Sequence, residues 1–409
     1  MLHRIWLSFF LIGFISALYQ CFFLGDMDIF QRMVKATFDM AGLSVELSLG
    51  LIGLLSFWLG IVALGEASGL IQRLGLLLSP LFNRLMPEVP KGHPAIASMT
   101  LNLSANILGL DNAATPLGLK AMKDLQTLNP KPDTASNTQI LFLVLNTSSV
   151  TLFPITVLLY RAQLGAPDPA SVFIPILIAT SCSTLVGLII TCWVQRVNLF
   201  NAVTMMYLGL GFALILSVVG YFSTLTIDAL SEQSSLISNL LIVSLIILFL
   251  SVAHIKKVNV YETFVEGAKK GFQVAIDIIP FLLAMLVAIG IFRASGALNI
   301  LIEWIRSMVL LFTTDTRFVD VLPTAFMKPL SGSGARAMMV DTMNQYGVDS
   351  FQGLLAATIQ GSTETTFYVL AIYFGSVGIR HGRHALACGL SADVAGITAA
   401  IVLAHWFFI

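Results

Sequence analysis

The segment IQGSTETTF, residues 359–367, places polar groups inside a stretch that is otherwise apolar enough to cross a membrane. Its polar side chains are Gln360, Ser362, Thr363, Glu364, Thr365 and Thr366. A carboxylate at mid-depth costs roughly 2.5–3.5 kcal/mol on insertion scales, so Glu364 should be paired, protonated or hydrated. Two interpretations stay open: Glu364 binds a solute, coupling ion or proton, or it locks the structure through a partner such as Arg336. Arg336 has its own alternative, as an anchor at the membrane interface.

A second polar cluster lies in the segment NTSSVTLFP, residues 146–154, which also interrupts an apolar stretch. Its candidate binding residues are Asn146, Ser148, Ser149 and Thr151. Serine and threonine often donate hydrogen bonds to carbonyls of their own membrane helix. The cluster as a whole, and no single hydroxyl, therefore indicates a site.

Two further segments, 94–124 and 320–346, are too long for loops and too broken for membrane spans. We expect each to form a helical hairpin that enters the membrane and returns. Their candidate binding residues are Asn102, Asn106, Asp111, Asn112 and Thr115 in the first hairpin and Ser331, Ser333 and Arg336 in the second. Asparagine amides both donate and accept hydrogen bonds, which suits a nucleobase, a sugar or an amino-acid-like ligand.

The hairpin residues also have structural interpretations. Asp111 and Asn112 suit capping and turn chemistry at the start of a half-helix. The SGSG turn, residues 331–334, could hold an anion or carboxylate on its backbone N–H groups, or it could be a flexible turn capped by Ser333. It is not a P-loop, because the full GxxxxGK[ST] pattern is absent.

Metal, cofactor and enzyme chemistry have little support in this pattern. The four cysteines lie in apolar runs without ligand spacing, and we expect neither a disulfide nor a zinc site. His381 and His384 lie in the basic loop IRHGRH, where interface anchoring is favoured over metal binding. No histidine falls in a polar-centred span, so a nucleophile–base pair is not evident. We expect no cofactor and no enzymatic activity.

The composition indicates an integral membrane protein. Of the 409 residues, 57% are hydrophobic and only 11% are charged, whereas soluble domains carry about 25% charged residues. The net charge of zero gives no electrostatic support for nucleic-acid binding. Apolar runs of about 20 residues predict spans at 5–24, 44–64, 170–194, 202–224, 235–255, 274–293 and 385–408, with two polar-centred spans at 138–161 and 351–375.

The distribution of lysine and arginine sets the expected orientation. Arg4 precedes the first run, which is longer than a typical signal core of about 7–15 residues, so we read it as a retained span with a cytoplasmic N-terminus. Nine spans then place the basic loops 254–270 and 379–384 inside and the loop 165–171 outside. Three arginines, at 293, 306 and 317, fall outside and weaken the fit locally.

An internal repeat explains this organisation. Ala67-Ser68-Gly69 matches Ala294-Ser295-Gly296, and each triplet ends a span and begins an amphipathic helix expected at the interface. Further along, Ser148 aligns with Ser362 and Thr151 with Thr365. By the charges, span 44–64 runs inward and its counterpart 274–293 runs outward. The sequence thus predicts an all-α membrane protein with two inverted-topology repeats, interfacial helices, re-entrant hairpins and broken transmembrane helices, as in transporters.

The motifs also resemble known families. NILGLDNAATPLGLKAM, residues 106–122, is similar to the spore maturation protein A family. KPLSGSGARAMMVDTM and IQGSTETTFYVLAIYFGSVGIRHGRHAL, which begin at residues 328 and 359, are similar to the spore maturation protein B family. Both families belong to the Gate, or nucleoside-recognition, group, so the resemblance implies a fused chain with a transporter-like core of hairpins and broken helices.

The predicted organisation is a first transmembrane helix at 1–28, a first Gate repeat, similar to spore maturation protein A, at 29–196, two linking helices at 197–256, and a second Gate repeat, similar to spore maturation protein B, at 257–409. The function that fits best is alternating-access transport, or binding, of a small polar solute that is nucleoside-like or amino-acid-like. The alternative is a membrane assembly or regulatory protein that uses the same fold to bind a ligand or partner. We expect a bacterial inner-membrane location, contact with lipid, a coupling proton or sodium ion, and a homo-oligomer.

Overall fold

A computed structural model describes residues 2–108, 111–148 and 150–409, with side chains described except at 2, 3, 111–113, 227, 228 and 231. The described residues form α-helices, two short 3-10 helices and no β-strand. The prediction of an all-α membrane protein is therefore confirmed.

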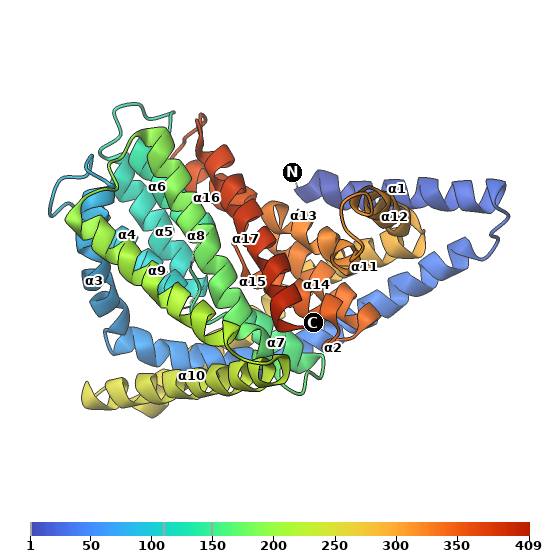
Figure 1. Ribbon diagram of the computed structural model, residues 1–409, viewed down its shortest axis with the longest axis horizontal. Coiled ribbons are helices and arrows are strands. Elements are labelled where there is room, and N and C mark those ends of the chain that lie inside the picture. Colours follow the sequence, from blue (N-terminus) through green and yellow to red (C-terminus); the bar gives the residue numbers. More distant parts are fainter. Residues whose placement is uncertain (1, 109–110, 149) are drawn as a thin grey trace. The chain divides into compact units, whose positions relative to one another are not determined.

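The first part of the chain contains one long helix followed by shorter ones (Figure 1). The helices are α1 (Leu2–Phe23), α2 (Ile29–Ala67), α3 (Leu70–Leu85), α4 (Pro94–Ile107), α5 (Asp111–Gln126), α6 (Asn137–Thr147), α7 (Ile155–Gln163), η1 (Pro169–Val172) and α8 (Phe173–Gln195). Two linking helices follow, α9 (Ala202–Ser223) and α10 (Ile227–Ile255).

The second part begins with another long helix and repeats the order of the first. Its elements are α11 (Val260–Ala294), α12 (Ala297–Val309), η2 (Arg317–Val321), α13 (Leu322–Leu330), α14 (Gly332–Tyr346), α15 (Phe351–Gly361), α16 (Thr366–Ser376) and α17 (Ala385–Phe407). Helices α2 to α8 thus correspond in order to α11 to α17. The corresponding helices α6 and α15 both have 11 residues, and α8 and α17 both have 23.

Each long helix is followed, two residues after its end, by a glycine that turns the chain into the next amphipathic helix. Gly69, before α3, has a φ of 77°, and Gly296, before α12, has a φ of 73°. This left-handed conformation is accessible to glycine at little cost and strains residues that carry a Cβ atom. The matched Ala-Ser-Gly triplets of the sequence therefore mark the same turn in both parts.

Seven described helices are long and apolar enough to span a membrane, and they coincide with the seven unbroken spans expected from the sequence. The two polar-centred spans are each interrupted. The first is broken between Thr147, where α6 ends, and Ile155, where α7 begins directly after Pro154, and the second is broken between Gly361 and Thr366. The predicted breaks are thus present at proline and glycine, the residues least compatible with a helix interior.

The chain forms two compact units, each assembled from separate stretches. The first unit comprises residues 1–60, 156–169 and 267–360, and the second comprises 61–155, 170–266 and 361–409. Each unit combines a hairpin with one half of each broken helix, so α4, α5, α6 and α16 belong to the second unit and α13, α14, α15 and α7 to the first. The domain division predicted from the sequence follows the repeats and stays a prediction.

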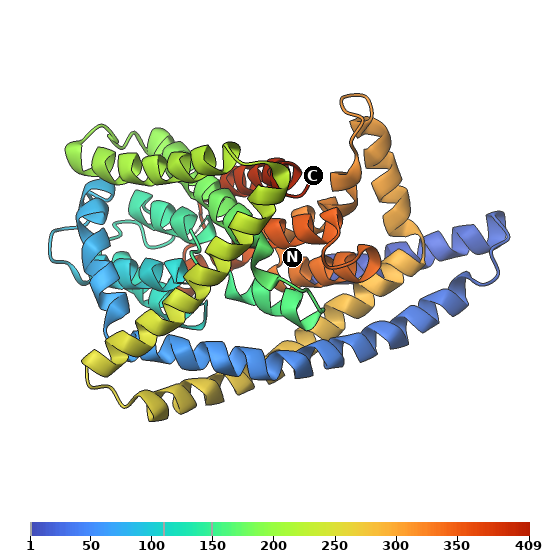
Figure 2. The same ribbon diagram turned by 60° about the horizontal axis from the view of Figure 1, so that its bottom comes forward.

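In the second unit, α17 packs along α8, and both helices contact α6 (Figure 1). The hairpin helices α4 and α5 pack against each other, α16 contacts α5, α6 and α17, and α3 lies against α4 and α9 (Figure 2). Buried apolar side chains of α4, α5 and α6, with Tyr373 and Phe374 of α16, form a core cluster of this unit. In the first unit, α13 and α14 form the second hairpin, and α12 contacts α1 and η2.

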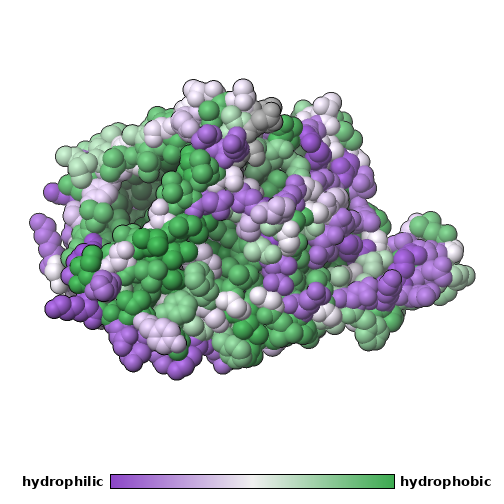
Figure 3. All heavy atoms as spheres, turned by 90° about the horizontal axis from the view of Figure 1, so that it is seen from below, coloured by the Kyte–Doolittle hydropathy of each residue, from purple (hydrophilic) through white to green (hydrophobic). Residues whose placement is uncertain are grey.

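Apolar side chains also cover much of the face drawn in Figure 3, where they are green. Helix α9 exposes Leu210, Phe212 and Leu214, and α10 exposes Leu240 and Ile247. Such continuous apolar exposure is costly in water and normal for helices that face lipid tails. The surface therefore agrees with a multi-pass membrane protein.

Candidate functional site

The second unit buries a cluster of amide and phenol groups, which we call the amide–phenol cluster: Asn102, Asn106, Asn146 and Tyr373. The Asn146 carbonyl oxygen Oδ1 accepts a hydrogen bond of 2.8 Å from Asn106 Nδ2 and another of 3.2 Å from the Tyr373 hydroxyl. Asn102 Nδ2 donates to the Ala114 carbonyl at 2.8 Å and lies 3.4 Å from the Tyr373 hydroxyl. The cluster therefore joins both hairpin helices, α6 and α16.

Local features of the sequence position these groups. Ser136 and Gln139 form a capping box that fixes the start of α6, one end of which carries Asn146. Gly118 of α5 leaves room for the phenol, because a Cβ atom at this glycine would lie 2.0 Å from the Tyr373 oxygen. The Tyr373 ring stacks on Phe142 at 5.9 Å between centroids. The phenol is thus held by packing as well as by hydrogen bonds.

One acceptor of this cluster has no hydrogen-bond partner among the described residues. Asn102 is fully buried, and its Oδ1 atom makes no hydrogen bond there. An unsatisfied buried acceptor costs about 1–3 kcal/mol, so a group that donates to it would bind favourably. The unpaired oxygen makes this cluster the strongest candidate for a ligand site.

The break between α15 and α16 lies beside the end of α6. The Thr147 carbonyl accepts hydrogen bonds of 2.7 Å from the Glu364 backbone N–H and 2.9 Å from the Thr363 hydroxyl. The Thr363 hydroxyl also lies 2.6 Å from Asp393 Oδ1 of α17. Residues of the second broken helix are thus bonded to the end of the first half-helix.

Glu364 itself is half-buried, and its carboxylate makes no hydrogen bond or ion pair with a described residue. Arg336, the partner considered from the sequence, belongs to the first unit, and the pairing of the two stays a prediction. Binding of a ligand or an ion by this carboxylate stays a prediction.

The remaining candidates of the second unit lie around the two breaks. Ser148 ends α6, and its carbonyl accepts a hydrogen bond from the Thr184 hydroxyl of α8. Thr151 lies in the link before α7, Ser362 and Thr365 are buried in the link before α16, and Thr115 is half-buried on α5. Three predicted residues fall outside the described part: Ser149, and Asp111 and Asn112 by their side chains.

The first unit holds the candidates of the second hairpin. Ser331 caps α14 by accepting a hydrogen bond of 3.0 Å from the Gly334 N–H, and it lies 3.3 Å from the Ser333 hydroxyl. The cap is therefore Ser331 and not Ser333, because the helix begins two residues earlier than a cap at Ser333 would require. Arg336 lies half-buried on α14, and Gln360 is buried on α15 with no partner for its Oε1 atom among the described residues.

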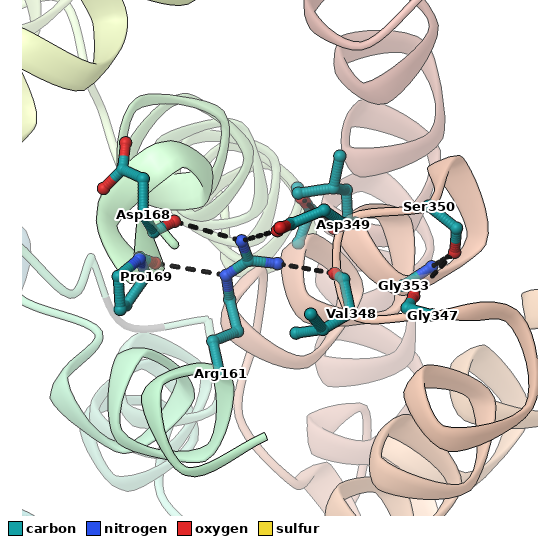
Figure 4. Close-up of polar contacts among 10 residues, drawn as sticks. Arg161, Asp168, Pro169, Gly347, Val348, Asp349, Ser350 and Gly353 are labelled. Carbon is teal, nitrogen blue, oxygen red and sulfur yellow. Dashed lines mark hydrogen bonds and ion pairs between the residues drawn. The ribbon is translucent and has the colours of Figure 1, made fainter. Parts of the chain in front are cut away.

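A buried arginine that the sequence analysis missed organises one end of the first unit (Figure 4). Arg161 of α7 is fully buried and pairs with Asp349 at 2.8 Å. It also donates to the backbone carbonyls of Asp168, Pro169 and Val348 at 3.1, 3.2 and 3.0 Å. Its role is to fasten the loop after α7 to the loop before α15. The local signal is an arginine near the end of an apolar helix, which does not by itself identify its distant partners.

The three arginines that weakened the orientation argument are all held in ion pairs within the first unit. Arg293 pairs with Asp341. Arg306 pairs with Asp320 at 2.6 Å, and Arg317 pairs with Asp315 at 2.6 Å. Structural pairing accounts for their presence in this part of the chain.

Comparison with known proteins agrees with this geometry. The Gate family, described as nucleoside recognition, matches residues 7–164 and 275–380. Spore maturation protein B of Bacillus subtilis (strain 168) is 46% identical over 154 residues, which are 38% of this chain and 85% of that protein. Spore maturation protein A of the same organism is 37% identical over 190 residues, which are 46% of this chain and 93% of that protein. The two relatives match different parts of the chain, as in a fusion of both.

Proposed function

The chain belongs to the Gate family of membrane proteins, and on that premise we propose that it binds a small polar solute and moves it across the bacterial inner membrane by alternating access. The solute class is nucleoside-like or amino-acid-like. The N-terminus would be cytoplasmic, as the lysine and arginine distribution indicates.

The observation that carries this proposal is the amide–phenol cluster with its unsatisfied Asn102 oxygen. Three amides and one phenol offer donors and acceptors within a few ångströms of one another. A nucleobase edge or a sugar hydroxyl presents the complementary pattern. A ligand N–H or O–H that bonds Asn102 Oδ1 would remove the cost of the unsatisfied acceptor.

The repeated helix order supports transport over static binding. Interrupted helices and hairpins are tolerated at membrane depth only where protein or a water-filled cavity surrounds them. In secondary transporters such elements meet near the bilayer midplane and belong to repeats of inverted topology. Both hairpins and both helix breaks are present here in corresponding positions, and the inverted charge pattern of the sequence is what supports the inversion.

Thermal stability in detergent tests the binding part of the proposal. We expect one or more members of a nucleoside and amino-acid series to raise the melting temperature of the protein. Asn102→Ala should reduce that shift, whereas Asn299→Ala, an exposed asparagine on α12, should leave it unchanged. A stabilising ligand whose effect is equal in both variants would exclude the cluster as its site.

Uptake or efflux in proteoliposomes tests the transport part with the same ligand. A second candidate function is a membrane assembly or regulatory role, because both relatives are named for spore maturation and not for transport. A ligand that binds through Asn102 but does not cross the membrane would select this second function.

A further inference from the structure

Asp393 is a carboxylic acid in the middle of the transmembrane helix α17, where it is almost fully buried. Its Oδ1 atom lies 2.6 Å from the Thr363 hydroxyl, which in turn lies 2.9 Å from the Thr147 carbonyl. These three groups form a continuous chain from α17, through the break before α16, to the end of α6.

Counting protons along this chain distinguishes two states of Asp393. The Thr363 hydroxyl has one hydrogen, and the Thr147 carbonyl can only accept. If Asp393 is ionised, the hydroxyl donates to the carboxylate, and its contact with the Thr147 oxygen then brings two acceptors together. If Asp393 is protonated, it donates to Thr363, which donates to Thr147, so both contacts are hydrogen bonds. The 2.6 Å distance between the Thr363 hydroxyl and Asp393 fits either state. The contact between Thr363 and the Thr147 carbonyl distinguishes the states, because it is a hydrogen bond only when Asp393 is protonated.

The surroundings of Asp393 also favour the neutral form. Helices α6, α8 and α16, which pack against α17, contain no lysine or arginine within their bounds. An ionised carboxylate in such an apolar region is expensive, and a protonated one is much less so.

Among the described residues of α17 and of the helices that contact it, the groups that can become cationic are His254, in the last turn of α10, and His405, in the last turn of α17 and twelve residues after Asp393. The other described titratable groups here are Cys182 and Cys192 on α8, Tyr368 and Tyr373 on α16, Glu232 on α10, Cys388 on α17 itself, and Glu364 in the break. Glu364 follows Thr363 directly, and its negative charge, where present, would further disfavour ionisation of Asp393.

Close packing holds the break against this part of α17. A Cβ atom at Gly396 would lie 2.8 Å from the Ser362 carbonyl, and one at Gly389 would lie 2.8 Å from the Thr366 side chain. The glycines therefore let the backbone of the break approach the helix on both sides of Asp393. The carboxyl group reaches Thr363 because no larger side chain separates the two segments.

We propose that Asp393 is a proton-binding site whose protonated carboxyl closes the hydrogen-bond chain through Thr363 to Thr147 and so ties the two helix breaks together. The proton comes from water and returns to it, with no other bond made or broken. Loss of the proton removes the hydrogen bond between Thr363 and Thr147 and weakens the attachment of the break, while the Glu364 N–H bond to the Thr147 carbonyl remains. The inference deepens the coupling-ion part of the proposed function, but proton binding can be measured without any solute or transport.

Infrared spectroscopy of the purified protein observes the proposed proton directly. A protonated carboxylic acid has a carbonyl band separate from that of a carboxylate. We expect this band in the wild-type protein at neutral pH and its loss in Asp393→Asn. Asp341→Asn, which changes another buried carboxylate, serves as the control and should retain the band. Absence of a band assignable to Asp393 at neutral pH would overturn the proposal, whether or not the protein transports anything.

Thermal stability as a function of pH tests the link to the helix break. An asparagine at 393 can donate to Thr363 as the protonated acid does, so Asp393→Asn should keep the chain and remove its pH dependence. Relative to this variant, wild-type protein should lose at least about 2 °C in melting temperature between about pH 5 and about pH 9. Thr363→Val should be less stable than wild type at low pH, and Thr363→Ser should restore the stability.

Two results would overturn the proton assignment. One is a wild-type protein and an Asp393→Asn variant with the same pH profile. The other is stabilisation by sodium over potassium that depends on Asp393 at constant pH, which would identify a sodium ion as the bound cation.

Discussion

The two units fasten corresponding loops with different chemistry. In the second unit, the loop before α6 is tied to the loop after α16 mainly by backbone hydrogen bonds. The Asp133 carbonyl accepts from the Arg380 and His381 N–H groups at 2.8 and 3.0 Å, and Ala135 N–H donates to the His381 carbonyl at 3.0 Å. In the first unit, one buried side chain, Arg161, makes the equivalent tie (Figure 4).

Helices α6 and α15, which begin beside these two ties, share a cap position but differ in the residues that follow it. Ser136 caps α6 and Ser350 accepts from the N–H three residues later at the start of α15, so the cap position is shared. The residue three positions on is Gln139 in α6 and Gly353 in α15. Gly353 has no room for a side chain, because a Cβ atom there would lie 2.3 Å from the Gly347 carbonyl. The repeat therefore preserves where the chain is fastened and not how.

The largest effect is expected at Arg161, because this one residue makes the tie between the two loops of the first unit. Arg161→Met should destabilise the protein by at least about 3 kcal/mol, because several buried acceptors lose their donor together. Melting in detergent measures this, with Arg380→Met as control, since the exposed Arg380 contributes its backbone to the tie. Equal melting temperatures for the two variants would contradict the difference between the ties.

Exchanging Gln139 and Gly353, which lie three positions after the two caps, should destabilise the protein less than Arg161→Met does, and by different amounts in the two helices. Gly353→Gln forces a side chain against backbone and should cost about 1–3 kcal/mol. The reverse change, Gln139→Gly, removes half of a capping box and a good helix former, and should cost roughly 0.5–2 kcal/mol. If Gly353→Gln were neutral, the close approach of residue 347 would not constrain this helix start.

A weaker effect is expected at the tie of the second unit, which joins the loop before α6 to the loop after α16. Arg383 is exposed and donates one hydrogen bond of 3.1 Å to the Ala135 carbonyl. Arg383→Ala should cost about 0.5–1.5 kcal/mol, because the neighbouring backbone hydrogen bonds remain. Hydrogen exchange should show protection of the Ala135 N–H retained in this variant, whereas its loss would show that the side chain holds the tie.

The smallest effect concerns pH at the same loop. Burial, and then the charge of Arg383, lower the pKa of His384 below its ordinary value of 6.5. The neutral ring can accept a hydrogen bond from Gln195 at 3.1 Å. Below about pH 6.5 the unfolded chain binds the proton more readily than the folded one, so stability should fall as the pH decreases. His384→Gln should flatten this part of the melting profile, and an unchanged profile would assign the decrease to other groups.

Much of the helical architecture was predictable because the length of an apolar run, and the glycine or proline that interrupts it, are local properties of the chain. The unbroken spans follow from runs of apolar residues, and the breaks from Gly361 and Pro154. The asparagines of the first hairpin were predictable by residue type, and Asn102, Asn106 and Asn146 do lie together. Tyr373 was missed because a phenol in an apolar helix has no local signature of its partners.

The partition of each broken helix between two compact units was not predictable in the same way. It depends on contacts between segments more than 200 residues apart, such as those of Asn146 with Tyr373 and of Thr147 with Thr363. Arg161 was missed for a similar reason, because its partners lie in another part of the sequence. Periodicity and composition report burial of a segment but not which distant segment covers it.

The length of α2 links the protein to the thickness of its membrane. Its 39 residues make a helix about 58 Å long at 1.5 Å per residue, close to twice the hydrocarbon core of about 30 Å. Such a helix must either tilt steeply or carry its first turns, with Arg32, Lys35 and Asp39, out among the lipid headgroups. Thinner bilayers increase the mismatch, so lipid chain length becomes a physical variable that acts on this protein through one helix.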